Sequence, residues 1–254
     1  MYILNEEEFI RDTLASRKKP KDISISYLIS LTAKYYYLNN PDIDRQILID
    51  TVKKKIREFK ILGYQEHRYF NKIVQACDNA INSEVDNLFR RIEYIPIYES
   101  EISKIMKLNN NQEKKFMFTV YALARYMNCG GWINKKDYKS FSEVFELANI
   151  ASSISCRNEM IHKLYENNFI ELSRKIDNLN IRVNLINDGE VAYKIKKFEN
   201  LGNQYLCQFE KRYKFCATPG CTGKVVITGK NSKYCYQCAR ERKLMKYKKY
   251  NEKR

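Results

Sequence analysis

Residues 139–169, KSFSEVFELANIASSISCRNEMIHKLYENNF, contain two amphipathic segments separated by a short polar turn. The first segment has apolar residues at helical spacing, including Val144 and Phe145, and the second repeats this spacing with Ile161 and Leu164. Residues three and four apart lie on one face of a helix, so each segment can bury one side. The stretch therefore predicts two consecutive helices that pack against a shared core.

The segments on either side of these helices have the character of strands. Residues 131–134, GWIN, precede the helices, and residues 170–176, IELSRKI, and 181–187, IRVNLIN, follow them around a polar turn. Alternating segments joined in this way are typical of a β-hairpin. The order strand, helix, turn, helix, hairpin is that of a winged helix-turn-helix domain, whose second helix enters the DNA major groove. Protein-docking and dimerisation modules can share this order.

Polar residues on the outer side of the second helix are candidates for reading DNA bases. We place Arg157, Asn158 and His162 on this side, because Arg and Asn side chains suit bidentate hydrogen bonding to guanine and adenine. His162 has no cysteine or carboxylate partner in a ligand pattern, so it is more typical of a surface or capping residue than of a metal ligand or a catalytic base. The predicted wing would bring further basic residues near DNA phosphates: Arg174, Lys175 and Arg182.

Four cysteines towards the C-terminal end form two short pairs, Cys216-x4-Cys221 and Cys235-x2-Cys238, with 13 residues between the pairs. Residues 225–228 between the pairs form a strand candidate flanked by glycines, as a zinc ribbon requires. Four thiolates favour tetrahedral Zn²⁺ and leave no open position for a catalytic water. The pattern predicts a structural zinc site, with a redox dithiol or an iron–sulfur cluster as alternatives.

The residues around the second cysteine pair are aromatic and basic. Tyr234 and Tyr236 flank Cys235, and the sequence does not choose between packing around the metal and facing a ligand. Residues 208–254 contain 14 Lys/Arg and 3 Asp/Glu, whereas the rest of the chain contains 32 and 27. The end of this segment predicts a basic helix that binds nucleic-acid phosphates. Its candidate contacts are Arg240, Arg242, Lys243 and Lys246.

The pattern along the whole chain predicts a mainly α protein with three parts. Residues 1–92 show helical periodicity and form a helical N-terminal domain, in which Cys77 belongs to an apolar stripe. Residues 93–207 form the winged-helix-like domain, an α+β region whose most apolar helix should bury Phe116. Residues 208–254 form the small zinc ribbon with its basic helical tail.

Composition bounds the class of protein. A hydrophobic share of 44% with 30% charged residues indicates a soluble globular chain, and no apolar run approaches the roughly 20 residues of a membrane span. The acidic start lacks a signal-peptide core, so we expect a cytoplasmic protein with reduced cysteines. The chain has two histidines, no carboxylate cluster with metal spacing and no phosphate-loop glycine pattern. We therefore expect that it is not an enzyme, a nuclease being the class weighed against this.

Several segments resemble proteins encoded by bacteriophages and integrated mobile elements of Firmicutes, a group without an assigned activity. The resemblance rests on FELANI (145–150), IHKLYENNFIELSRKIDNLNIRV (161–183), FENLGNQYL (198–206) and SKYCYQCARE (232–241), and it extends over most of the chain. The first cysteine pair, CATPGC, departs from the usual Cys-x-x-Cys by two residues. The resemblance implies a mobile-element setting in a bacterial host cell.

We expect from these features a DNA-binding protein of a phage or mobile element, acting in transcription regulation or replication initiation. Its main partner would be double-stranded DNA. The alternative is an interaction adaptor that docks on host or phage machinery, such as RNA polymerase or replication proteins.

Overall fold

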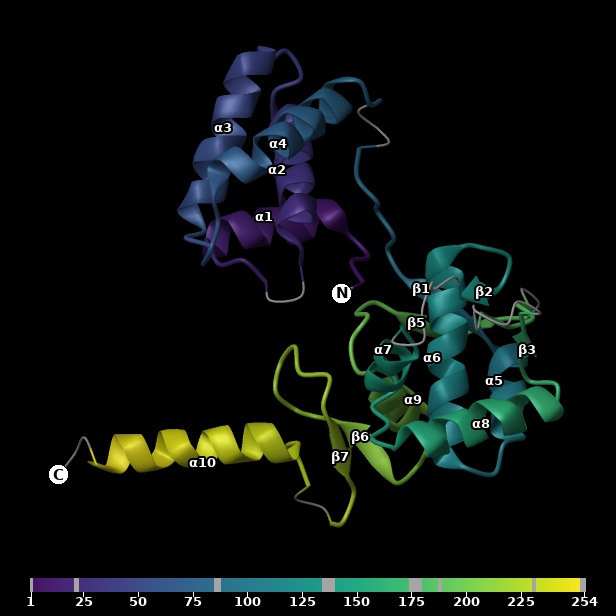
Figure 1. Ribbon diagram of the computed structural model, residues 1–254. Coiled ribbons are helices and arrows are strands. Elements are labelled where there is room, and N and C mark those ends of the chain that lie inside the picture. Colours follow the sequence, from purple (N-terminus) through teal and green to yellow (C-terminus); the bar gives the residue numbers. More distant parts are fainter. Residues whose placement is uncertain are drawn as a thin grey trace. The chain divides into compact units, whose positions relative to one another are not determined.

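The computed structural model describes residues 2–20, 23–84, 88–133, 140–173, 180–186, 189–229 and 232–251 (Figure 1). The chain divides into two compact units, Met1–Glu93 and Tyr94–Arg254. Helices predominate in the described part of the chain, so the predicted mainly α class is confirmed. None of these helices combines the length and the apolar character needed to cross a membrane. The predicted division of the second unit after residue 207 stays a prediction.

The first unit is built from four helices, α1 (Glu6–Ser16), α2 (Ile25–Asn39), α3 (Arg45–Glu58) and α4 (Glu66–Ile81). Each helix turns an apolar stripe inward, which removes apolar surface from water and is the main favourable contribution to its packing. The fully buried residues include Ile10, Leu28, Leu31, Leu48, Val52 and Ile73. Cys77 lies among them with no exposed surface, so its prediction as a core thiol is confirmed. Burial raises the pKa of Cys77 to about 12.

The core of the second unit forms around α6 (Asn111–Met127). Phe116 and its neighbours along this helix are fully buried, as the sequence predicts, while the last residue, Met127, is only half-buried. Helix α9 (Leu201–Phe209) packs against α6. Gly202 allows α9 to approach the backbone at Ala148 closely, because a Cβ at position 202 would lie 1.8 Å from the carbonyl oxygen of Ala148.

One edge of this core carries a two-stranded sheet that the sequence did not reveal. Strand β1 (Ile95–Tyr98) pairs antiparallel with β5 (Val191–Ile195) and leads into α5 (Glu99–Met106). Ile95 lies opposite Ile195, and both side chains are buried. The pairing thus joins the start of the unit to a segment 93 to 100 residues later in the chain.

The middle of the unit follows the predicted order of elements. After α6 come β2 (Trp132–Ile133), α7 (Ser140–Leu147), α8 (Ile154–Glu166), β3 (Glu171–Leu172) and β4 (Ile181–Arg182). The strands form an antiparallel sheet of order β2-β4-β3. Helix α8 begins at Ile154, because the Ser153 side chain accepts a hydrogen bond from the backbone N–H of Cys156 and caps the helix.

The C-terminal part contains a hairpin of β6 (Tyr213–Phe215) and β7 (Lys224–Val226), followed by α10 (Tyr236–Asn251). Both strands pack against α9, which also contacts α6. Val225 is buried on the cysteine side of the hairpin. The hairpin is therefore fixed to the core of the second unit.

Candidate metal centre

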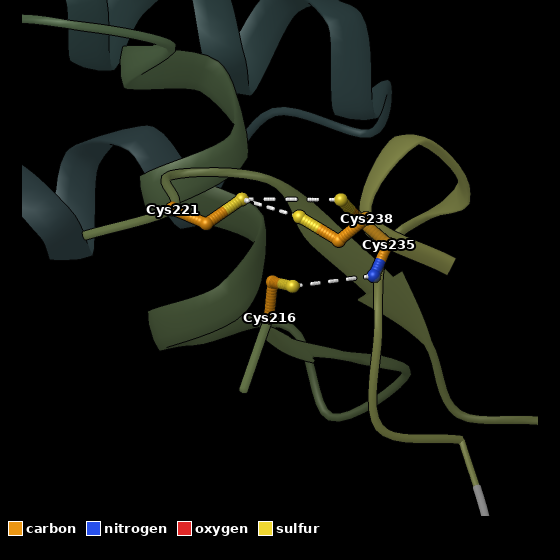
Figure 2. Close-up of side chains that lie close together, drawn as sticks. All are labelled: Cys216, Cys221, Cys235 and Cys238. Atoms are coloured by element: carbon orange, nitrogen blue, oxygen red, sulfur yellow. Dashed lines mark hydrogen bonds between the residues drawn. The ribbon is translucent and has the colours of Figure 1, made fainter. Parts of the chain in front are cut away.

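The four paired cysteines bring their sulfur atoms together at the loop end of the β6–β7 hairpin (Figure 2). All four sulfurs lie within 4.8 Å of one another. The Sγ of Cys221 is 3.9 Å from that of Cys235 and 3.6 Å from that of Cys238. Together with Cys216, these residues form a group that can hold a metal ion, as the sequence predicts. Among the described residues no second group of His, Cys, Asp and Glu side chains reaches this arrangement.

The first cysteine pair is shaped by the loop between β6 and β7. Cys216 follows β6, and its backbone N–H donates to the carbonyl of Gly223 at 3.0 Å. The backbone N–H of Cys221 donates to the carbonyl of Thr218 at 3.1 Å, which closes a turn that contains Gly220 at φ 73°. A positive φ of this size favours glycine. Because of this turn, the four residues between Cys216 and Cys221 bring the two thiols close together.

Gly223 is a further part of the site that the sequence analysis missed. Its backbone N–H donates to the Sγ of Cys221 at 3.3 Å. A Cβ at this position would lie 2.8 Å from the Sγ of Cys235 and 3.2 Å from that of Cys221. The sulfurs therefore leave room only for a glycine. The available signal was the glycine two residues after a paired cysteine.

The second cysteine pair stands where α10 begins. The backbone N–H of Ala239 donates to the carbonyl of Cys235 at 2.9 Å, so this cysteine already takes part in the helical hydrogen-bond pattern. Cys238 lies within the first turn of α10 and is buried. Helix formation thus directs both thiols of the pair towards the hairpin.

The environment of the sulfurs affects the thiols unequally. Burial opposes ionisation of Cys216, but backbone N–H groups of Cys235 and Thr218 point at its sulfur and lower its pKa to about 6. The N–H of Gly223 favours the Cys221 thiolate. Burial and the neighbouring sulfurs outweigh that bond and raise the pKa of Cys221 to about 12. A cation bound by all four sulfurs would have to displace protons from this cluster.

The two tyrosines beside the second pair have different surroundings, which answers a question that the sequence left open. Tyr234 packs against the cysteine cluster, and the guanidinium of Arg242 lies 4.2 Å from its ring centroid. Tyr236 is 84% exposed. Tyr234 thus belongs to the wall of the site, whereas Tyr236 is available to a ligand.

Helix α10 carries the predicted basic residues on its surface. Six of its sixteen residues are Lys or Arg and one is Glu. The four predicted phosphate contacts are all exposed: Arg240, Arg242, Lys243 and Lys246. Lys243 lies over the ring of Tyr247, with 5.9 Å between its Nζ and the ring centroid. The helix therefore presents an excess of positive charge directly beside the cysteine cluster.

The residues predicted to read bases do not share one environment. Asn158 and His162 are exposed on α8, and His162 Nδ1 lies 3.4 Å from the carboxylate of Glu166. Arg157 is half-buried and differs from the expectation. Its guanidinium lies 5.0 Å from the ring centroid of Phe145, and its Nη1 donates to the Ser142 hydroxyl at 3.3 Å. The long side chain of Arg157 covers an aromatic ring of α7 instead of facing outward.

The predicted wing is described only in part. Arg182 on β4 is exposed, and its Nη1 lies 3.1 Å from the carboxylate of Glu171 on β3. Its guanidinium also lies 5.8 Å from the ring centroid of Trp132. Arg174 and Lys175 lie outside the described residues.

Comparison with known proteins gives one relative to report. The chain is 30% identical over 219 residues to the cytoplasmic serine–tRNA ligase of Plasmodium falciparum. The match covers 71% of this chain and 34% of the relative, so the chain spans about a third of the relative's length. No family model matches the chain. No solved structure matches it.

This match corrects one expectation from the sequence. The chain was expected not to be an enzyme, because the sequence lacks a carboxylate cluster and a phosphate loop. The relative is an enzyme by its name, and this finding contradicts the expectation. Short local motifs do not reveal a similarity of this kind, which is spread over 71% of the chain.

Proposed function

We propose that the four cysteines bind one structural Zn²⁺ ion. Zn–S bonds of about 2.3 Å in a tetrahedron place neighbouring sulfurs about 3.8 Å apart. The distances of 3.9 Å and 3.6 Å from Cys221 to Cys235 and Cys238 lie on either side of this value. Four soft thiolates suit zinc, and they fill its tetrahedral shell. The ion would fix the β6–β7 hairpin to the start of α10.

We further propose that α6 to β4 form a winged helix-turn-helix module. Support comes from the order α6, β2, α7, α8, β3, β4 and from the sheet order β2-β4-β3. In such a module α8 would be the recognition helix and the β3–β4 connection the wing. Asn158 is the exposed candidate for a base contact on this helix.

With these two parts, we propose that the protein binds DNA in a phage or mobile element, in transcription regulation or replication initiation. The observation that carries the proposal is the basic helix α10, which exposes Arg240, Arg242, Lys243 and Lys246 next to the proposed zinc site. Cations of this kind displace counterions from DNA phosphates, so they supply affinity for any sequence. Contacts from α8 would then add preference for a particular site.

Titration of full-length, metal-loaded protein against a labelled duplex at several salt concentrations tests this proposal. We expect the logarithm of the affinity to fall linearly with the logarithm of the salt concentration. Each cation removed by Lys243→Gln or Lys246→Gln should weaken binding to every duplex and reduce this slope by about 0.9. Lys54→Gln is the matched control, because Lys54 is an exposed lysine of α3 in the first unit. Absence of duplex binding at low salt would refute DNA binding.

Two other candidates give different results in the same assay. An adaptor for transcription or replication proteins would retain DNA only weakly and without sequence preference. The serine–tRNA ligase match favours RNA as a second candidate, because the relative acts on tRNA by its name. If unlabelled tRNA displaces the duplex more effectively than a duplex competitor of equal length, the RNA candidate replaces DNA.

A further inference from the structure

Helix α10 presents tyrosines and cations in one longitudinal stripe. Tyr236, Arg240, Lys243, Tyr247 and Tyr250 follow one another at spacings of four, three, four and three residues. At 3.6 residues per turn, these spacings keep all five positions on one side of the helix. We call these five residues the tyrosine–cation stripe. Along the stripe, the cations Arg240 and Lys243 lie between the ring of Tyr236 and the rings of Tyr247 and Tyr250, an order that the overall count of basic residues does not reveal.

The rings of the tyrosine–cation stripe are strongly exposed. Tyr236 is 84% exposed, Tyr247 57% and Tyr250 59%, and the cations Arg240 and Lys243 are exposed as well. Tyrosine normally buries its ring and leaves only its hydroxyl in contact with water. Three large rings in water on one helix face therefore indicate a surface with a ligand. The Nζ of Lys243 lies 5.9 Å from the ring centroid of Tyr247, so a charge and a ring of the stripe lie close together.

We propose that the tyrosine–cation stripe binds single-stranded DNA, with bases stacked on Tyr236 and Tyr247 and phosphates held by Arg240 and Lys243. This inference rests on the proposed DNA-binding function and specifies that α10 binds the single-stranded form of DNA. Base–aromatic stacking together with cations along the backbone is the usual chemistry of single-strand binding. Tyr236 and Tyr247 are about 16 Å apart along the helix axis, and both cations lie between them.

Duplex DNA can contact the cations of the tyrosine–cation stripe but cannot stack its bases on the tyrosines. Its bases are stacked inside the helix and offer only their edges, so a ring on the outside gains little, while cations reach the phosphates in either form. The tyrosines of the stripe therefore distinguish an unpaired strand from a duplex. The cysteine cluster adds pre-organisation, because Tyr236 is followed two residues later by Cys238, a member of that cluster. Fixing the backbone that carries the first ring reduces the ordering that binding requires.

The test measures binding of full-length, metal-loaded protein to three labelled probes: a mixed-sequence DNA single strand, the duplex of the same sequence, and the matching RNA strand. Tyr236→Ala and Tyr247→Ala should each lower affinity for the DNA strand about tenfold and leave duplex affinity within about twofold. Tyr236→Phe keeps the ring and should bind like the unmodified protein. Metal content and circular dichroism check that each variant folds.

Met245→Ala is the matched control on the same helix. Met245 is 64% exposed and lies nine residues after Tyr236, about 180° around the helix from it. This variant should bind the DNA strand normally, and an equal loss here would overturn the assignment to one face. The inference also fails if the tyrosine variants weaken duplex and single-strand binding equally, or if the RNA strand is preferred. Duplex binding without single-strand binding refutes only this inference, whereas loss of all binding refutes the proposed function too.

Discussion

The backbone N–H of Cys235 donates a hydrogen bond to the sulfur of Cys216 at 3.4 Å, across 19 residues of sequence (Figure 2). This bond ties the start of α10 to the end of β6. It also favours a thiolate at Cys216, because an N–H directed at sulfur stabilises negative charge. The cysteine cluster thus joins two segments and prepares a charged ligand at the junction.

Of the eight cysteines, only the four in the two pairs should determine the metal content. We expect Cys235→Ser to lose the metal, because the three remaining thiols cannot complete a four-thiolate site. Without the metal, the backbone N–H of residue 235 is also no longer held against the sulfur of Cys216. Purified unmodified protein should contain about one zinc ion per chain by mass spectrometry. Cys77→Ser is the control, because Cys77 is buried in the first unit. Equal metal content in all cysteine variants would contradict the assignment.

A single methyl group at Gly223 should disturb the metal site. The Cβ of Gly223→Ala would lie 2.8 Å from the Sγ of Cys235, so one of the sulfurs must move. We expect metal affinity to fall roughly tenfold or more, as for other changes that misplace ligands. Competition with a chromogenic chelator measures this affinity. Gly229→Ala, which meets no atom within 4 Å, should bind metal normally, and similar losses in both variants would disprove the steric explanation.

The buried lysine of α6 should make the second unit more stable as the pH rises from 7.5 to 9.5. Burial, with a smaller effect of Lys224, lowers the pKa of Lys115 to about 8. In the unfolded chain this lysine has a pKa of about 10.4, so between the two values the unfolded state binds more protons. Stability must then increase with pH, by about 2 kcal/mol over this range.

Comparison with Lys115→Met isolates that contribution, because the methionine cannot titrate. Urea unfolding followed by the fluorescence of Trp132, which is the one tryptophan of the chain and lies in the second unit, gives the free energy of unfolding. The difference in stability between the two proteins should shift by about 2 kcal/mol in favour of the lysine form. A difference that stays constant with pH would show that Lys115 titrates normally.

Arg157 should contribute to stability. Its guanidinium covers the ring of Phe145 and bonds to Ser142, so Arg157→Ala should lower the free energy of unfolding by about 1 kcal/mol. The same Trp132 fluorescence measurement reports it. His162→Ala, on the exposed side of α8, should change stability by less than about 0.5 kcal/mol. If the two variants have the same free energy of unfolding, the packing of Arg157 on α7 does not contribute to stability.

The parts that the sequence predicts well are those determined by local spacing. The cysteine pairs are such a case, because short turns and a helix start direct their thiols. The apolar stripe of α6 is another, since Phe116 and its neighbours follow helical periodicity. Arg157 was placed on the wrong side because a helical repeat does not show that the ring of Phe145 offers it a partner.

The elements that the sequence did not reveal depend on distant partners. Strand β1 contains Pro96 and is short, so its identity as a strand comes from pairing with β5. Helix α9 contains Gly202, and glycine is a poor helix former. A glycine is needed at this position because the helix approaches the backbone of Ala148 closely. The charge of the tail was visible, whereas the fate of Tyr234 and Tyr236 required the position of the cysteine cluster.

The contacts of α9 with both α6 and the β6–β7 hairpin bear on the lifetime of the protein in a cell. A chain that loses its metal would loosen the hairpin and uncover α9, whose residues Leu201, Tyr205 and Leu206 are buried. Cellular proteases cleave chains that expose such segments, and modest losses of stability reduce abundance several-fold. Metal supply would then govern how much of the protein accumulates, through degradation and independently of its synthesis.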